Sequence, residues 1–276
     1  MPLITASPPP PSYDRDYVVR DITDFYTFLT KMYLPSELLR IPPPEGWSFI
    51  TPERYAWLKK TPTVIDLMRH LPYITREDND GHKIYIETAV VDYEGEQVRS
   101  TMRFAEEHGR KRPHLDTIEP DPTTFDFDTS IPEYMLVLAS ETCGGDGYWW
   151  LLDTQRGTLT LYDAGTRHSG QREKGTIENE PVQEGVNDDE LWREHPTWRL
   201  KEFLDMLKEQ YTTLELVPRG PADVEKRWDG DFGKAQISAF TGCGWPDLST
   251  YRKDECMERL KKLLHAHLYK TELPVF

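Results

Sequence analysis

An unbroken apolar segment, residues 134–139, constrains the fold of this chain more than any other feature of its sequence. It reads Tyr134-Met135-Leu136-Val137-Leu138-Ala139 and has the length of a strand. Successive side chains of a strand point to opposite faces of its sheet, so a strand that is apolar throughout is covered on both faces. The sequence therefore predicts an inner strand here, with other layers of structure on each side of it.

A predicted hairpin follows this strand. Residues 148–153 and 158–162 are rich in aromatic, aliphatic and β-branched side chains, and residues 154–157 between them end in glycine and have the composition of a turn. Trp149 and Trp150 are neighbours on the first of these strands and point to opposite faces, so we interpret them as core residues rather than as a ligand platform. Further strands are expected over residues 83–91, 214–217 and 235–240.

Helical periodicity marks the beginning, the middle and the end of the chain. Amphipathic helices are expected over residues 17–33, 200–211 and 256–268, where apolar residues recur every three or four positions. Thr51-Pro52 and Thr61-Pro62 each combine a capping residue with proline at the first helical position, and each predicts a short helix. The predicted fold is α+β, with a mixed, mainly antiparallel sheet packed by N-terminal, middle and C-terminal helices.

The chain shows no linker between two self-sufficient cores, so residues 13–276 are predicted to form a single α+β domain. Residues 1–12 end in Pro8 to Pro11, favour polyproline II and have little to bury, which predicts a disordered tail. Surface loops are expected near residues 105–131 and 165–190, where charged and loop-forming residues replace the apolar pattern.

Net charge limits the classes of partner. The chain has 33 basic and 48 acidic residues, a formal net charge of -15. Such a field repels phosphate backbones and anionic lipid, so we expect no nucleic-acid partner and no membrane partner. The absence of a long apolar run and of a secretory signal predicts a cytoplasmic or nuclear protein. Three cysteines, Cys143, Cys243 and Cys256, fit a reducing compartment in which they stay as thiols.

A glycine-rich string precedes the second predicted strand, Thr142-Cys143-Gly144-Gly145-Asp146-Gly147. One interpretation is a ligand loop, with Gly144, Gly145, Asp146 and the loop of Trp47 around a bound group. It lacks the Lys-Ser/Thr of a phosphate loop, and a strand follows it instead of a helix. The favoured interpretation is a tight connection in which glycine permits positive φ.

Catalysis has a weaker basis in the sequence. Cys143 would need a base to act as a nucleophile, and none of the eight histidines stands at a recognised catalytic spacing from a cysteine. The alternative to a binding protein is a hydrolase or transferase with Cys143 or Asp146 in a pocket at residues 143–150, closed by the Trp47 loop.

No metal and no cofactor are expected. Paired-cysteine zinc spacing is absent, and His265 and His267 stand two apart on a predicted helix, where they point to different faces. The acidic segment 116–128 lacks the spacing and the central glycine of a calcium hand. We expect its Asp121, Asp126 and Asp128 to be protein-interaction residues instead, because the acidic charge favours a basic protein partner. The sequence leaves the oligomeric state open.

The order of these elements resembles that of the SUKH superfamily, which includes a yeast regulator of cell-wall glucan synthesis and many bacterial immunity proteins. The resemblance covers residues 17–211. It is carried by a first helix that ends in Leu34-Pro35, the strand Tyr148 to Asp153 with its glycine turn and second strand, and a loop followed by a helix that Trp198-Arg199-Leu200-Lys201-Glu202-Phe203-Leu204 opens. The strings around Arg69 to Ile74 and Cys143 to Trp150 are also similar to fungal proteins. The resemblance implies a non-enzymatic, intracellular protein-binding or regulatory scaffold.

Overall fold

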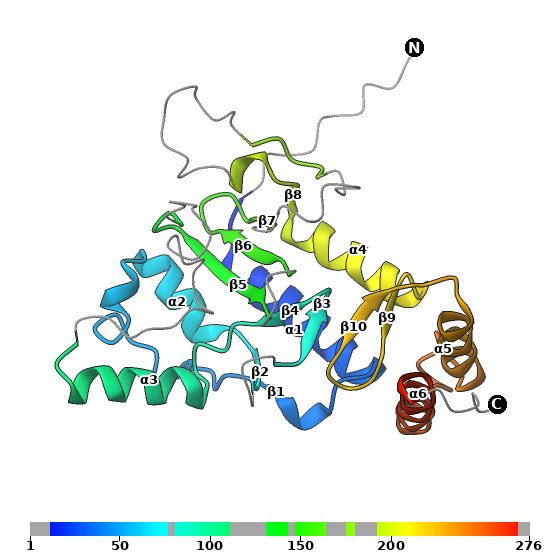
Figure 1. Cartoon of the computed structure of the whole chain (residues 1–276). Helices are drawn as coiled ribbons and strands as arrows, with labels where there is room; N and C mark the ends of the chain where they lie inside the picture. Colours follow the sequence, from blue (N-terminus) through cyan, green and yellow to red (C-terminus); the bar gives the residue numbers. More distant parts are fainter. Residues whose placement is uncertain are drawn as a thin grey trace, which may run out of the picture.

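A curled, six-stranded antiparallel sheet forms the centre of the protein in a computed structural model (Figure 1). The structure describes residues 12–76, 81–110, 131–142, 147–163, 175–179 and 192–269. The strands lie side by side in chain order: β3 (Lys83–Tyr85), β4 (Thr88–Val90), β5 (Met135–Glu141), β6 (Trp149–Asp153), β7 (Thr158–Tyr162) and β8 (Thr197–Arg199). The α+β fold is confirmed, and every strand pairing in the described ranges is antiparallel, where the sequence predicted a mixed, mainly antiparallel sheet.

Strand β5 confirms the inner strand predicted from the apolar run. It pairs with β4 on one side and β6 on the other, and its residues from Met135 to Ser140 are buried. The hairpin β6–β7 is also confirmed, and Gly157 at its turn has a φ of 66° that favours glycine. Trp149 and Trp150 are 3 % and 1 % exposed, as expected of core residues on opposite faces of β6.

Two helices, α1 (Arg15–Met32) and α4 (Leu200–Thr212), pack together against this sheet. The Trp150 ring lies between them, with its centroid 6.2 Å from that of Phe25 and 4.9 Å from that of Phe203. Asp14 caps α1 by accepting hydrogen bonds from the backbone N–H groups of Asp16 and Tyr17. The sequence predicted both helices to within a few residues.

The segments between α1 and the sheet contain a second predicted helix, α2 (Pro62–His70), which starts where Thr61-Pro62 indicated. The Thr61 side chain accepts a hydrogen bond from Val64 N–H, and Pro62 occupies the first turn. The short helix predicted after Pro52 is only one 3₁₀ turn, η2 (Ala56–Leu58). Another 3₁₀ turn, η1 (Ser36–Leu38), leads into β1 (Leu39–Arg40), which pairs with β2 (Tyr73–Ile74).

Three sequence expectations need correction. The strand predicted over residues 83–91 is a hairpin, because the chain turns between β3 and β4 at Glu87, whose φ is 45°. The strand predicted over 235–240 lies inside helix α5 (Asp231–Gly242), whose buried Phe232, Gln236, Ala239 and Phe240 follow helical spacing. Helix α3 (Glu96–Glu107) was not predicted, and the loop expected from residue 105 begins within it, where Ala105 is buried. Most of the loops expected over 105–131 and 165–190 lie outside the described residues.

A C-terminal unit completes the fold. The hairpin of β9 (Leu216–Pro218) and β10 (Val224–Lys226) lies beside β3, and it is followed by α5 and by α6 (Lys253–Leu268), the last predicted helix (Figure 1). Tyr251 Oη donates to the carbonyl of Met32 (2.8 Å), and Lys253 Nζ donates to the carbonyls of Thr30 and Leu34. These bonds attach the unit to the end of α1. Buried apolar residues from α1 to α6 form one connected cluster, and the single-domain organisation stays a prediction.

Two of the three cysteines belong to this unit. Cys243 at the end of α5 and Cys256 on α6 are buried free thiols. Burial raises the pKa of the Cys256 thiol to about 12, which keeps it protonated and unreactive at neutral pH. Cys143 lies outside the described residues.

Candidate functional site

Most residues singled out in the sequence lie outside the described ranges. These are Cys143, Gly144, Gly145 and Asp146 of the glycine string and Asp121, Asp126 and Asp128 of the acidic segment. Gly147 is described, and it has no room for a side chain, because a Cβ there would clash with the carbonyl oxygen of Glu87. This close backbone approach requires glycine at position 147, whereas the tight connection predicted for the glycine string stays a prediction, because residues 143–146 lie outside the described residues.

Trp47, the remaining predicted ligand residue, is held from several sides. Its Nε1 donates to the carbonyl of Leu71 (2.8 Å), and its ring centroid is 6.2 Å from that of Tyr73. The guanidinium of Arg40 lies over the same ring, 5.3 Å from its centroid. Trp47 therefore supports a neighbouring charged site by positioning Arg40.

That charged site is an arginine–carboxylate cluster of Arg40, Asp92, Glu94 and Arg99. The two carboxylate residues are only 5 % exposed each. Arg40 Nη2 donates to both carboxylate oxygens of Asp92 at 2.7 Å, and its Nη1 binds Glu94, which Arg99 also binds. Both buried carboxylates are thus paired with arginine, as charges in a protein interior must be.

The chain brings the carboxylates together through a turn between β4 and α3. Gly95 N–H donates to the carbonyl of Asp92 (3.1 Å), and the Asp92 side chain accepts a bond from Glu94 N–H (3.2 Å). Between them, Tyr93 points the other way and donates through its hydroxyl to Val137 on β5 (2.9 Å). Asp92 and Glu94 therefore lie at the N-terminal end of α3, whose dipole favours negative charge.

A hollow of about 330 Å³ opens at this cluster and is lined by Arg40, Thr75, Asp92, Gly95 and Arg99, with Glu94 and Glu96. Burial raises the pKa of Asp92 to about 6, against the lowering effect of Arg40. A carboxyl group that titrates near neutrality can exchange protons with a ligand. Here its oxygens are already bonded to Arg40 and to the backbone, so the geometry favours a structural ion-pair network.

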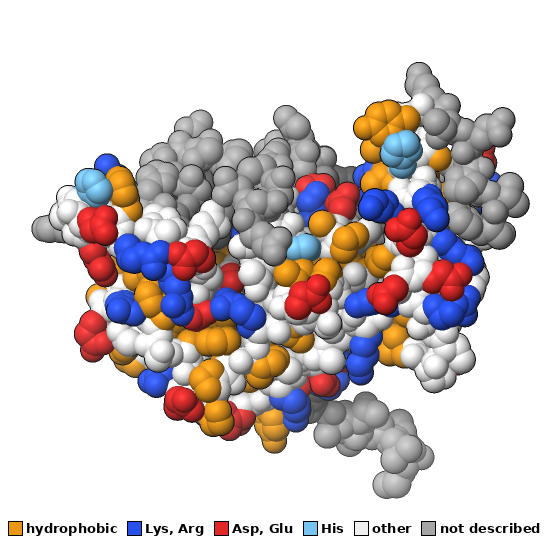
Figure 2. Space-filling model, turned by 90° about the horizontal axis from the view of Figure 1, so that it is seen from below, with side chains coloured by type: hydrophobic (Ala, Val, Ile, Leu, Met, Phe, Trp, Pro, Cys, Tyr) orange, Lys and Arg blue, Asp and Glu red, His pale blue; other side chains and the backbone are white. Residues whose placement is uncertain are grey.

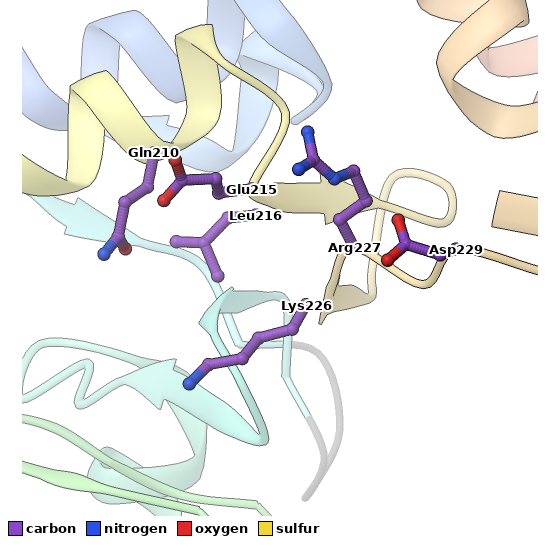
Figure 3. Close-up of a pocket in the computed structure, with 6 residues that line it drawn as sticks. All are labelled: Gln210, Glu215, Leu216, Lys226, Arg227 and Asp229. Carbon is purple, nitrogen blue, oxygen red and sulfur yellow. The ribbon is translucent and has the colours of Figure 1, made fainter. Parts of the chain in front are cut away.

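A second hollow, of about 270 Å³, lies at the other side of the sheet, between α4 and the β9–β10 hairpin. It is lined by Gln210, Glu215, Leu216, Lys226, Arg227 and Asp229 (Figure 3). We call it the α4–β10 hollow. Leu216 is buried, and Lys226 and Arg227 extend in opposite directions from neighbouring positions.

The charges of the α4–β10 hollow contrast with those of the cluster. Within the described part of the chain, the side chains of Glu215, Lys226, Arg227 and Asp229 form neither an ion pair nor a side-chain hydrogen bond, and all four residues are exposed. Two cations and two anions thus border one small hollow without neutralising each other. Such charges remain available to groups from outside the molecule.

Basic and acidic side chains alternate over the face of the molecule that Figure 2 shows, rather than separating into fields of one sign. The residues outside the described ranges hold 16 of the 48 acidic residues and 6 of the 33 basic ones. Two thirds of the net charge of -15 therefore belongs to those segments.

Neither site could have been found from local sequence patterns. Arg40 and Asp92 are 52 positions apart, and only the pairing of β1 with β2 and the turn before α3 bring them together. The one local signal is Asp92-Tyr93-Glu94, two carboxylates that directly follow a predicted strand.

No function can be assigned to the chain from metal sites, membrane-spanning helices or known relatives. The described residues contain no group of three or more His, Cys, Asp or Glu side chains that could hold a metal ion. Among the helices of the described ranges, none combines the length and the apolar character needed to cross a bilayer. No protein-family model, curated protein or solved structure matches the chain.

Proposed function

We propose that this chain is a non-enzymatic protein-binding or regulatory module of SUKH-like type that engages a basic protein partner. The scaffold is consistent with that proposal, since a curled antiparallel sheet packed by helices is the kind of mixed scaffold that the resemblance implies. At the arginine–carboxylate cluster, the carboxylate oxygens of Asp92 are engaged by Arg40 and the backbone, which argues against a free acid or base at that hollow.

The distribution of acidic charge is the observation that carries the proposal. Residues 111–130 and 180–191 contain ten acidic and two basic residues, and both segments connect elements of the described fold. Acidic connections on a nearly balanced body produce a local field that attracts basic proteins and accelerates their encounter. Segments that connect the elements of a scaffold also frequently carry binding residues.

The test uses the full chain as bait in an extract of the source organism. The variant Asp121→Lys, Asp126→Lys, Asp128→Lys is compared with Glu37→Lys, Glu45→Lys, Glu209→Lys, which changes the net charge equally at exposed positions elsewhere. We expect the first variant, and not the second, to lose a captured basic protein, and the on-rate of that protein to fall as salt screens the attraction. Equal capture by both variants at all salt concentrations would contradict the proposal.

A hydrolase or transferase is the second candidate, and the pKa of Asp92 favours it. A buried carboxyl group titrating near pH 6 beside an open hollow is common in active sites. The test is a hydrolase or transferase activity of the full chain. Loss of that activity in Asp92→Asn, or in Cys143→Ser or Asp146→Asn at the glycine string, would support the enzyme over the binding module. Turnover retained in all three variants would reject these residues as catalytic groups.

A further inference from the structure

An exposed tryptophan stands at the edge of the α4–β10 hollow. Trp228 follows Arg227 directly, precedes Asp229, and is 55 % exposed. One side of its ring lies against the start of α5: a Cβ at Gly230 would lie 2.6 Å from the Trp228 ring, and one at Gly233 would clash with the Trp228 carbonyl oxygen. An exposed aromatic ring with one side already packed on the backbone has less conformational freedom to lose on binding than a free one.

The end of α6 extends this aromatic surface. The His267 ring is stacked on Phe232 with centroids 4.3 Å apart and lies 6.4 Å from the Trp228 ring. The next residue, Leu268, is 61 % exposed, whereas the Tyr269 ring packs against His265, with centroids 4.6 Å apart, on another side of α6. We call the surface formed by the following residues the Trp228 face: Glu215, Lys226, Arg227, Trp228, Asp229 and His267, with the adjacent Leu268.

The composition of the Trp228 face is typical of a protein interface. Tryptophan, tyrosine and arginine are the residues most often found as energetic centres of interfaces, with a polar rim around them. Exposed apolar side chains gathered in one region also indicate an interaction surface more strongly than single ones do. The face therefore fits a protein partner better than a small ligand, for which a hollow of about 270 Å³ is small.

Charge identifies the kind of partner. The whole chain carries a net charge of -15, but residues 219–269 contain nine basic and eight acidic residues, so this region adds little to the repulsion between copies. Counting partners among the described residues alone, the rim of the Trp228 face has two unpaired cations, Lys226 and Arg227, and two unpaired anions, Glu215 and Asp229. A rim of this kind complements itself, because a two-fold rotation can bring the cations of one copy to the anions of another.

We propose that the Trp228 face is a homodimer interface, in which two copies of this chain pack their Trp228 side chains together and pair Lys226 and Arg227 with Glu215 and Asp229 across a two-fold axis. A stable interface of ordinary size buries about 800 Å² on each copy, and Trp228 lies near its centre. This inference goes beyond the proposed function and does not depend on it.

The first test is the mass of the full chain in sedimentation equilibrium over a range of concentrations. We expect a reversible dimer for the natural sequence, and a dissociation constant raised about ten-fold or more by Trp228→Ala. The matched control is Tyr17→Ala, which removes an aromatic ring that is 59 % exposed on α1. A natural chain that stays monomeric at all concentrations, or equal effects of both substitutions, would overturn the proposal.

The second test reads the charge pairing directly and involves only exposed side chains, so both variants should fold. One variant carries Lys226→Glu and Arg227→Glu, and the other carries Glu215→Lys and Asp229→Lys. Each alone should be monomeric, because like charges then meet across the axis, and an equimolar mixture should form the heterodimer seen by native mass spectrometry. A mixture that remains monomeric while the natural chain dimerises would place the interface elsewhere.

The outcome also separates this proposal from the proposed function. If Trp228→Ala removes a captured partner protein while the natural chain is monomeric, the face serves a different protein and the homodimer is wrong. The opposite result is also possible: the dimer forms, but charge reversal at Asp121, Asp126 and Asp128 does not change the capture of a basic partner protein. In that case the homodimer is supported and the proposed function fails.

Discussion

The two charged hollows of this protein differ in what their charges do. In the arginine–carboxylate cluster, Asp92 and Glu94 are buried and bonded to Arg40, and the pairs join β1 to the turn that starts α3. In the α4–β10 hollow, the charged side chains are exposed and unpaired within the described residues. Buried charges depend on their partners, because removing one partner leaves the other charge buried and uncompensated, whereas exposed and unpaired charges contribute little to folding and remain available for recognition.

The largest effect is expected from removing the shared arginine of the cluster. Arg40→Met should lower the free energy of unfolding by about 3–5 kcal/mol, because it leaves the buried carboxylate of Asp92 without its arginine partner and Glu94 with Arg99 alone. The control, Arg20→Met, breaks the surface pair with Asp21 and should leave the free energy of unfolding nearly unchanged, because solvent screens the exposed Arg20. Urea unfolding followed by tryptophan fluorescence measures both. Equal losses in the two variants would show that the cluster is no more important than a surface ion pair.

An intermediate effect is expected in the pH dependence of stability. The pKa of Asp92 is raised from 3.8 to about 6 in the folded protein, so the folded state binds this proton more tightly than the unfolded state. The contribution of Asp92 to the free energy of unfolding is therefore complete below about pH 4 and is lost as the pH rises through 6. The size of this change is about 3 kcal/mol at most.

Asp92→Asn removes the titrating group and should flatten the stability profile between pH 4 and 6 relative to the natural chain. Glu45→Gln, a change at an exposed position, is the control and should leave the profile as it is. A profile for Asp92→Asn that runs parallel to that of the natural chain would mean that Asp92 does not titrate in this range.

The smallest effect on folding is expected at the α4–β10 hollow. Glu215→Gln and Lys226→Gln should each change the free energy of unfolding of the dilute monomer by less than about 0.5 kcal/mol, because neither side chain has a partner to lose in the part of the chain that the structure describes. Urea unfolding at low protein concentration measures this. A decrease of several kcal/mol in the free energy of unfolding from either change would show that the charges of both hollows stabilise the fold.

Much of the fold could be predicted because its signals are local. The caps at Thr61 and the apolar run of β5 act within a few residues, and the periodicity of α1, α4 and α6 is long enough to be unambiguous. Helix α5 was missed because a window of six residues, 235–240, does not distinguish a strand from a buried helix.

The candidate sites could not be predicted in the same way, because they depend on contacts between distant segments. Arg40 contacts Asp92 only because β1 pairs with β2. Glu215 and Lys226 line one hollow only because β9 pairs with β10. Trp47 was predicted as a ligand residue, but its indole N–H is bonded to the carbonyl of Leu71, and its ring supports Arg40. An aromatic residue in a proline-rich loop does not by itself show whether it faces a ligand or the core.

Amide hydrogen exchange of the natural chain at low and at high protein concentration tests the difference between the two hollows most directly. We expect residues 224–230 and the end of α6 to gain protection as the concentration rises, because the Trp228 face is then covered by a second copy. Residues 92–99 should exchange at the same rate at both concentrations, because the cluster is already complete in each copy. Protection gained at 92–99, or none gained at 224–230, would contradict the account.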